Sequence, residues 1–210
     1  MVFFLESVVL AALFYLIGSV ELRGLNETRA AYSHKKLFAA ILALLLFTIL
    51  AVSATPDLLP LICILTPLLL VIAILDLEMG LMSDVLSLVL GAAGMAYGLI
   101  RAPEMADYLP TLATGIALGA LGAFFAGPYS KWRGRDMLGW GDVKFFAAAG
   151  LWLAPTQLPL FLAIAGLVGV VNALVYRART GRAESPFAPP LCLALWLCVI
   201  YGLNLETLAL

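Results

Sequence analysis

Residues 60–76 read PLICILTPLLLVIAILD, an apolar run that carries no charge until it ends at Asp76. Similar runs of roughly 17–22 residues recur along the chain, and each would cross a hydrocarbon core about 30 Å thick as a helix. The composition agrees, because 64% of the 210 residues are hydrophobic and 12% are charged, whereas soluble domains have about twice that charged fraction. Continuous runs favour helices over alternating strands. The sequence therefore predicts an all-α fold, a polytopic transmembrane helical bundle.

Eight spans are expected, joined by short loops into a single membrane-embedded domain of residues 1–210. The spans are approximately 2–20, 37–54, 60–76, 85–101, 110–127, 142–154, 158–176 and 189–208. The first run carries Glu6 and has no basic segment before it, which is typical of a span rather than of a cleaved signal peptide.

The basic residues indicate the orientation of these spans. Eleven of the twelve Lys and Arg residues lie in or beside the loops on one side of the predicted membrane, and only Arg101 lies on the other. These loops are residues 21–36, 77–84, 128–141 and 177–188, with Lys144 adjoining the third. The positive-inside rule makes this side cytoplasmic, so both termini are expected outside. Dropping the short sixth span would scatter the basic residues over both faces.

Charge and composition also bear on the expected partners. The formal net charge is −1, which gives no indication of a nucleic-acid partner. The basic loop 21–36 is expected to contact anionic membrane lipids.

Four acidic residues converge on the predicted cytoplasmic side. Asp76, Glu78 and Asp84 lie in LDLEMGLMSD, and Asp142 lies in GWGDVKFF. Asp76 ends the third span, Asp142 begins the sixth, and the hairpin between them returns the chain to the same side. Ionisable residues at a membrane edge are functional candidates because their burial in lipid is unfavourable. We therefore expect Asp76 and Asp142 at the same depth, although they are 66 residues apart.

Two neighbouring carboxylates that share one proton can hydrolyse a peptide with water, without a metal or another cofactor. Gly139 and Gly141 are expected to permit positive φ and the close approach of an extended substrate. Because Asp76 ends a helix and Asp142 begins one, the helix dipole predicts that Asp76 more often carries the proton.

Three sequence blocks together resemble a known family. They are Asp76-x7-Asp84 at the end of one span, Gly139-x-Gly-Asp-Val-Lys144 at the start of another, and Pro186-Phe187-x-Pro189 before the last. In this order they resemble the type IV prepilin peptidases, which are GxGD aspartic peptidases facing the cytoplasm of bacterial membranes. The resemblance covers about residues 60–205.

The resemblance implies an aspartic endopeptidase with Asp76 and Asp142 as the catalytic pair. It implies that Asp84 orients the loop or the substrate and that Lys144 tunes the pair. The expected supporting residues are Gly139, Gly141, Lys144, Asp84 and Glu78. The implied substrates are prepilin-like precursors of pilus or secretion systems, with a short basic leader followed by a hydrophobic helix.

The chain departs from the long members of this family. Those members carry a cytoplasmic domain with two C-x-x-C pairs and add an N-methyltransferase activity. Here the first cytoplasmic loop has about sixteen residues and no cysteine, so we expect a short form, with no zinc site, that acts as a peptidase only. Cys63, Cys192 and Cys198 fall in apolar runs and are expected to be packing residues. Met82-Ser83 precedes Asp84 where Ile-Pro is usual, which leaves the shape of this loop open.

Other functions could use the same carboxylates. A metal-dependent lipid phosphotransferase would use Asp76, Glu78, Asp84 and Asp142 as magnesium ligands, and chelation would abolish its activity. An ion-coupled transporter would more often place its acids at the midplane, within repeated halves. A presenilin-like enzyme shares G-x-G-D but has Tyr-Asp where this chain has Leu75-Asp76, and this alternative ranks low.

Overall fold

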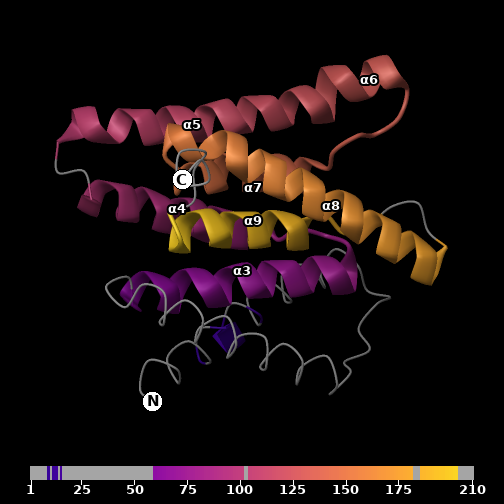
Figure 1. Cartoon of the computed structure of the whole chain (residues 1–210), viewed down its shortest axis with the longest axis horizontal. Coiled ribbons are helices and arrows are strands. Elements are labelled where there is room, and N and C mark those ends of the chain that lie inside the picture. Colours follow the sequence, from indigo (N-terminus) through magenta and orange to yellow (C-terminus); the bar gives the residue numbers. More distant parts are fainter. Residues whose placement is uncertain are drawn as a thin grey trace, which may run out of the picture.

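The computed structural model describes residues 9, 11–13, 15, 59–101, 104–181 and 185–202 (Figure 1). Throughout these ranges the chain forms helices and loops and no strand, so the prediction of an all-α fold is confirmed for this part. The predicted second span and the basic loop 21–36 lie outside the described residues, as do Glu6 and most of the predicted first span.

The helices follow one another with short connections. They are α3 (Leu59–Met79), α4 (Asp84–Arg101), α5 (Met105–Phe124), the π-helix η2 (Phe125–Tyr129), α6 (Ser130–Arg133), α7 (Trp140–Gly150), the 3-10 helix η3 (Pro155–Gln157), α8 (Leu158–Thr180) and α9 (Ala188–Ile200). The short connections make neighbouring long helices antiparallel, and α7 lies inside the bundle, packed mainly against α4 and α5 (Figure 1).

The lengths of the helices bear on the predicted spans. Two continuous helical stretches, Ala106–Arg133 and Pro155–Thr180, are long and apolar enough to cross a membrane. The 11 residues of α7, by contrast, rise only about 16 Å at ~1.5 Å per residue, roughly half of a hydrocarbon core. The predicted sixth span, 142–154, therefore corresponds to a helix too short to cross alone, and the count of eight spans stays a prediction.

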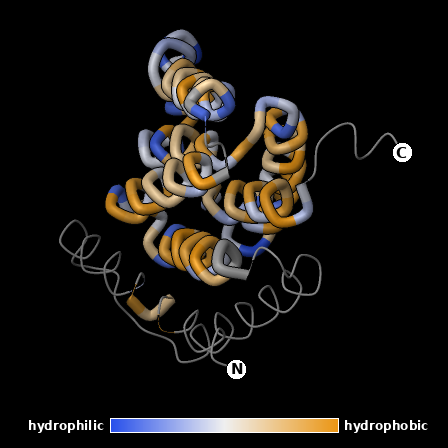
Figure 2. The backbone as a smooth tube through the Cα atoms, turned by 90° about the vertical axis from the view of Figure 1, so that its left-hand side faces the viewer, coloured by the Kyte–Doolittle hydropathy of each residue, from blue (hydrophilic) through white to orange (hydrophobic). Residues whose placement is uncertain are grey.

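The outer surface of the described bundle is apolar over long stretches. Leu167 and Leu174 of α8 are 70% and 65% exposed, and Ile100 of α4 is 82% exposed. Figure 2 shows hydrophobic residues along most of the described helices. Soluble monomers rarely expose apolar surface on this scale. The exposed faces fit contact with lipid.

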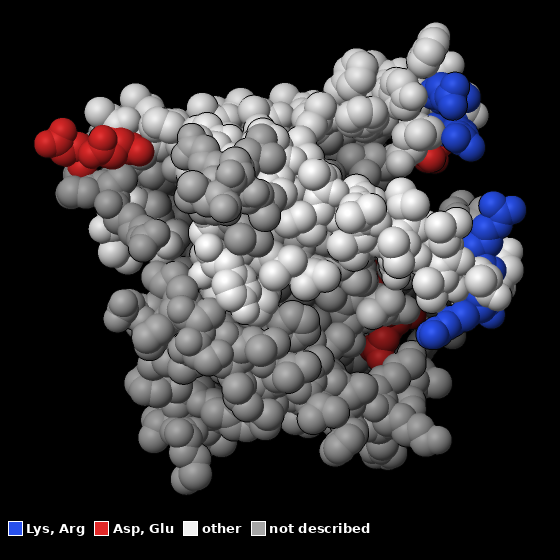
Figure 3. Space-filling model, in the orientation of Figure 1, with Lys and Arg blue, Asp and Glu red and all other residues white. Residues whose placement is uncertain are grey.

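Charged side chains occupy the two ends of the bundle. On the face shown in Figure 3, Lys and Arg gather at the end where α6 lies and where α8 finishes, and acidic side chains mark the opposite end, near the start of α5. The C-terminal end of α3, whose last turn contains Asp76, lies toward the basic end (Figure 1).

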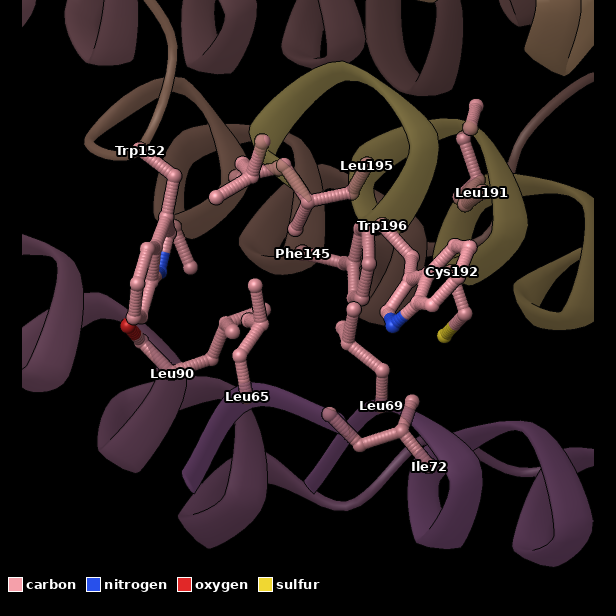
Figure 4. Close-up of a cluster of buried hydrophobic side chains, with 14 of the residues drawn as sticks. Leu65, Leu69, Ile72, Leu90, Phe145, Trp152, Leu191, Cys192, Leu195 and Trp196 are labelled. Carbon is pink, nitrogen blue, oxygen red and sulfur yellow. The ribbon is translucent and has the colours of Figure 1, made fainter. Parts of the chain in front are cut away.

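Glycines allow α7 and the turn after it to approach α4 and α5. A Cβ on Gly94 would lie 2.7 Å from the ring of Trp152, and one on Gly119 would lie 3.0 Å from the Cβ of Ala147. The indole of Trp152 donates a hydrogen bond to the carbonyl of Leu90 at 2.9 Å (Figure 4). The close packing of α7 and its following turn against α4 and α5 therefore depends on these glycines.

Buried side chains of α3 pack against those of α9 to form the core. In Figure 4, Leu65, Leu69 and Ile72 of α3 face Leu195 and Trp196 of α9, with Phe145 of α7 beside them. The indole of Trp196 donates to Thr66 at 3.1 Å, which satisfies both buried polar groups. All three cysteines are buried and none of them forms a disulfide, which agrees with their interpretation as packing residues.

Candidate functional site

Asp76 lies in the last turn of α3 and is buried, with 7% of its surface exposed. Its Oδ2 accepts a hydrogen bond of 2.8 Å from the backbone N–H of Ala188, the first residue of α9. The backbone N–H of Phe187 lies next to the same carboxylate. A side chain at the end of one helix therefore caps the start of another, 112 residues later in the chain.

The sequence at the start of α9 leaves few donors for Asp76. The first N–H groups of a helix have no partner within it, but Pro189 and Pro190 have no N–H. The N–H of Leu191 bonds to the carbonyl of Phe187 at 3.4 Å. The N–H in the first turn of α9 that is left without a partner inside the helix is that of Ala188, and it donates its hydrogen bond to Asp76.

Asp142 occupies the first turn of α7 and is half-buried. Gly139 is the N-cap of this helix, and the carboxylate of Asp142, three residues later, turns back toward the backbone N–H of Gly139. This is the half of a capping box in which an acid at N3 bonds the N-cap backbone. The positive end of the helix dipole lies at the same place and favours a negative charge.

The two carboxylates interact electrostatically, and both also interact with the buried thiol of Cys192, one turn after Ala188. The structure therefore brings together Asp76 and Asp142, the pair that the sequence placed at one depth. Two carboxylates that interact in this way can share a proton, hold a water molecule and move protons to and from a bound carbonyl.

From the sequence, the C-terminal end of α3 was the only helix end expected beside Asp76. The N-terminus of α9 faces the same carboxylate of Asp76 and favours a negative charge there. Helix position therefore no longer distinguishes Asp76 from Asp142, and the assignment of the shared proton to Asp76 stays a prediction.

The expected conformational role of the two motif glycines is wrong. Gly139 has φ of −73°, and Gly141 lies within α7, so neither has positive φ. Gly141 is needed for close packing within the chain, because a Cβ there would lie 2.8 Å from the Cβ of Met82. A Cβ on Gly139 would lie 3.2 Å from Oδ2 of Asp142. Both glycines thus make room for neighbouring groups of the protein itself.

Lys144 and Asp84 form an ion pair with each other, and the two side chains are 51% and 59% exposed. Together with small and apolar residues of α4, α5 and α7 they line a groove of about 770 Å³, which neither Asp76 nor Asp142 lines. The ion-pair partner of Lys144 is therefore Asp84, not the Asp76–Asp142 pair. An exposed ion pair of this kind contributes about 1 kcal/mol or less to stability.

Glu78 also has a partner away from the pair, because it accepts a hydrogen bond of 3.1 Å from the hydroxyl of Tyr15. The structure consequently does not gather Asp76, Glu78, Asp84 and Asp142 around one point. Within the described ranges, no group of three or more His, Cys, Asp or Glu side chains is arranged to hold a metal ion.

Two features of the loop between α3 and α4 answer the question that the sequence left open. Gly80 has φ of +65° and ends α3, with its N–H bonded to the carbonyl of Asp76 at 2.8 Å. Ser83 caps the start of α4, because its Oγ accepts a hydrogen bond of 3.2 Å from the N–H of Leu86. Glycine after a helix and serine before one are the usual end signals, so the sequence contained this information.

The contact between Asp76 and the start of α9 was missed by the sequence analysis. Pro189 and Pro190, the first two residues of the predicted last span, were the available signal, since prolines are tolerated in the first turn of a helix. That signal locates the helix start but does not identify the side chain facing it.

The model of the type IV leader peptidase family matches residues 63–174, more than half of the chain, and this range includes Asp76 and Asp142. The chain belongs to the type IV leader peptidase family. The resemblance that the three sequence blocks indicated is thereby confirmed at the level of the family. Pro186 to Pro189, the third block, lie beyond the matched range.

Several relatives of this leader peptidase family member carry the name prepilin leader peptidase/N-methyltransferase. The Aeromonas salmonicida protein is 28% identical over 183 residues, which make up 83% of this chain and 60% of the relative. The Pectobacterium carotovorum subsp. carotovorum protein is 30% identical over 142 residues, 67% of this chain and 49% of the relative. The Dichelobacter nodosus protein is 36% identical over 75 residues, 36% of this chain and 26% of the relative.

The chain spans less than two thirds of the length of these relatives. No solved structure matches it.

Proposed function

We propose that this member of the type IV leader peptidase family is a membrane aspartic endopeptidase. It removes the short basic leader of prepilin-like precursors at the cytoplasmic face of a bacterial inner membrane. The observation that carries the proposal is the interaction of Asp76 and Asp142, two carboxylates from separate helices, each next to a helix N-terminus. The names of the relatives support the choice of substrate.

The proposed mechanism uses one proton on the pair. The ionised aspartate takes a proton from a water molecule, which attacks the scissile carbonyl carbon, while the protonated aspartate gives its proton to the carbonyl oxygen. The aspartate that received the proton of the water then gives it to the leaving amine as the peptide C–N bond breaks, and the other aspartate takes a proton from a hydroxyl of the tetrahedral intermediate. The pair ends with one proton, as it began. Low local dielectric strengthens these interactions with the developing charges.

We propose the topology that places this pair at the cytoplasmic side, with eight spans and both termini outside. The gathering of the described basic side chains at one end of the bundle supports it. Membrane lipids would contact the exposed apolar faces of α4, α5 and α8. The hydrophobic helix of the substrate would remain in the membrane while its leader extends to the pair.

A cleavage assay tests this proposal against the metal-dependent alternative. Purified protein in lipid vesicles is incubated with a prepilin from the same genome, and leader removal is followed on a gel with and without EDTA. We expect cleavage at an unchanged rate in EDTA, because the pair needs no metal. Mass spectrometry of the mature product should show a free, unmethylated N-terminus. Cleavage that stops in EDTA and returns with magnesium would favour metal chemistry.

The dependence of the rate on pH provides a second test. Below the working range both aspartates are protonated and neither can take a proton from water. Above it both are ionised and neither can protonate the carbonyl oxygen. We therefore expect kcat/KM to follow a bell-shaped profile with one rising and one falling limb, which describe the pair as a unit. A rate that only rises with pH would indicate a single base and would contradict the shared proton.

A further inference from the structure

Asp76 depends on a short segment outside any helix for its hydrogen-bond donors. Ser185, Pro186 and Phe187 lead into α9, and the N–H groups that face Asp76 belong to Phe187 and Ala188. A small displacement of this segment would move both donors relative to the carboxylate. The contacts that hold the segment therefore also control the environment of Asp76.

Two residues of α8, Asn172 and Gly169, contact this segment and hold it in place. The amide Nδ2 of Asn172 donates a hydrogen bond of 2.8 Å to the carbonyl of Pro186. One turn earlier, Gly169 is buried against the ring of Phe187, where a Cβ would lie 2.8 Å from Cε2. Residues three apart lie on the same face of a helix. This face of α8 thus contacts two consecutive residues directly before Ala188.

Asn172 stands out in the sequence of α8. It is the first polar side chain in the helix, after fourteen residues from Leu158 to Val171. An amide placed in such an apolar helix is unfavourable unless it forms a hydrogen bond. The carbonyl of Pro186 is its acceptor, so the bond satisfies the amide and fixes the segment at the same time.

We propose that Asn172 is a positioning residue for Asp76. It acts through the carbonyl of Pro186 and sets where the N–H groups of Phe187 and Ala188 meet the carboxylate, without touching the substrate. This role rests on the proposed peptidase function, in which Asp76 belongs to the catalytic pair. A purely structural role, in which Asn172 only joins α8 to α9, would change the amount of folded protein but not the turnover of each folded molecule.

The test compares Asn172→Leu, which keeps the size of the side chain and removes the donor, with Asn172→Gln, which retains an amide. Gly169→Ala is expected to crowd Phe187, and Gly166→Ala is its matched control, because a Cβ on Gly166 meets nothing within 4 Å. For Asn172→Leu and Gly169→Ala we expect kcat to fall about tenfold, equivalent to about 1.4 kcal/mol, with KM changed less than about threefold. Asn172→Gln should recover much of the loss, and Gly166→Ala should equal the wild type.

Amide hydrogen exchange gives a readout that does not depend on activity. Because Pro186, Pro189 and Pro190 have no N–H, a peptide covering this segment reports mainly on Phe187 and Ala188. We expect faster exchange there in Asn172→Leu and unchanged exchange in Gly166→Ala. A wild-type kcat per folded Asn172→Leu molecule, or wild-type exchange, overturns the positioning role. Failure of the peptidase proposal is recognised separately, by cleavage that survives replacement of Asp142.

Discussion

Replacement of Asp142 by Asn is expected to reduce leader cleavage by about 10³-fold or more while leaving the protein folded. Asparagine has nearly the shape of aspartate, and its Oδ1 can still accept the N–H of Gly139, so the start of α7 should persist. The amide can neither take a proton from water nor return one to a leaving amine, and acid–base catalysis is worth about 10²–10⁴-fold. The measurement is the initial rate of leader removal from a prepilin in lipid vesicles.

Asp76→Asn should give a loss of the same size, although its surroundings differ. The N–H of Ala188 would still find an acceptor in the amide oxygen, so α3 and α9 should remain joined. The double variant should be no slower than either single variant, because the two groups act as one unit.

Asp107→Asn is the matched control, since Asp107 is an exposed acid in the first turn of α5 with no role in the pair. Its rate should stay within about twofold of the wild type. Normal abundance and thermal unfolding of all variants would show that they fold. Cleavage by folded Asp76→Asn and Asp142→Asn proteins at rates near that of Asp107→Asn would remove the basis of the proposed mechanism.

The lengths of the apolar runs and the placement of the basic residues were enough to predict the parts of the fold that depend on short-range sequence. The apolar runs at 60–76, 85–101 and 158–176 correspond closely to α3, α4 and α8. The length of α7 was harder to predict, because Leu151 to Ala154 continue its apolar pattern although the chain turns there. Hydropathy identifies residues that avoid water, but it does not tell whether lipid or the rest of the protein covers them.

The sequence was enough to predict that Asp76 and Asp142 lie at one depth, but not to predict the hydrogen-bond and ion-pair partners of the residues around them. Asp76 and Asp142 could be matched because loop topology gives depth in the membrane. The partners of Lys144 and Glu78 depend on how their helices are rotated about their axes. This rotation is set by packing against neighbouring helices, which the sequence of one helix does not determine. The same limit applies to the N–H of Ala188, which reaches Asp76 only because α9 packs against α3.

Gly150→Ala is expected to give the largest loss of stability among single methyl additions to this bundle. A Cβ on Gly150 would lie 2.5 Å from the Cα of Gly115 and 2.8 Å from the carbonyl oxygen of Thr114, both in the backbone of α5. No side chain can rotate away to make room, so α7 and α5 must separate. Overpacking of this kind lowers the free energy of unfolding of the protein by about 3 kcal/mol. The free energy of unfolding can be measured by denaturant titration in mixed micelles.

Gly166→Ala is the control for the chemical change itself, because Gly166 faces open space in the middle of α8. There the added methyl group should stabilise the helix by up to about 1 kcal/mol, since alanine favours helix more than glycine does. The two variants should therefore change the free energy of unfolding in opposite directions and by different amounts, although each adds one methyl group. Equal stability of the two would mean that α5 and α7 are not in backbone contact, and the position of Asp142 at the start of α7 would then need another explanation.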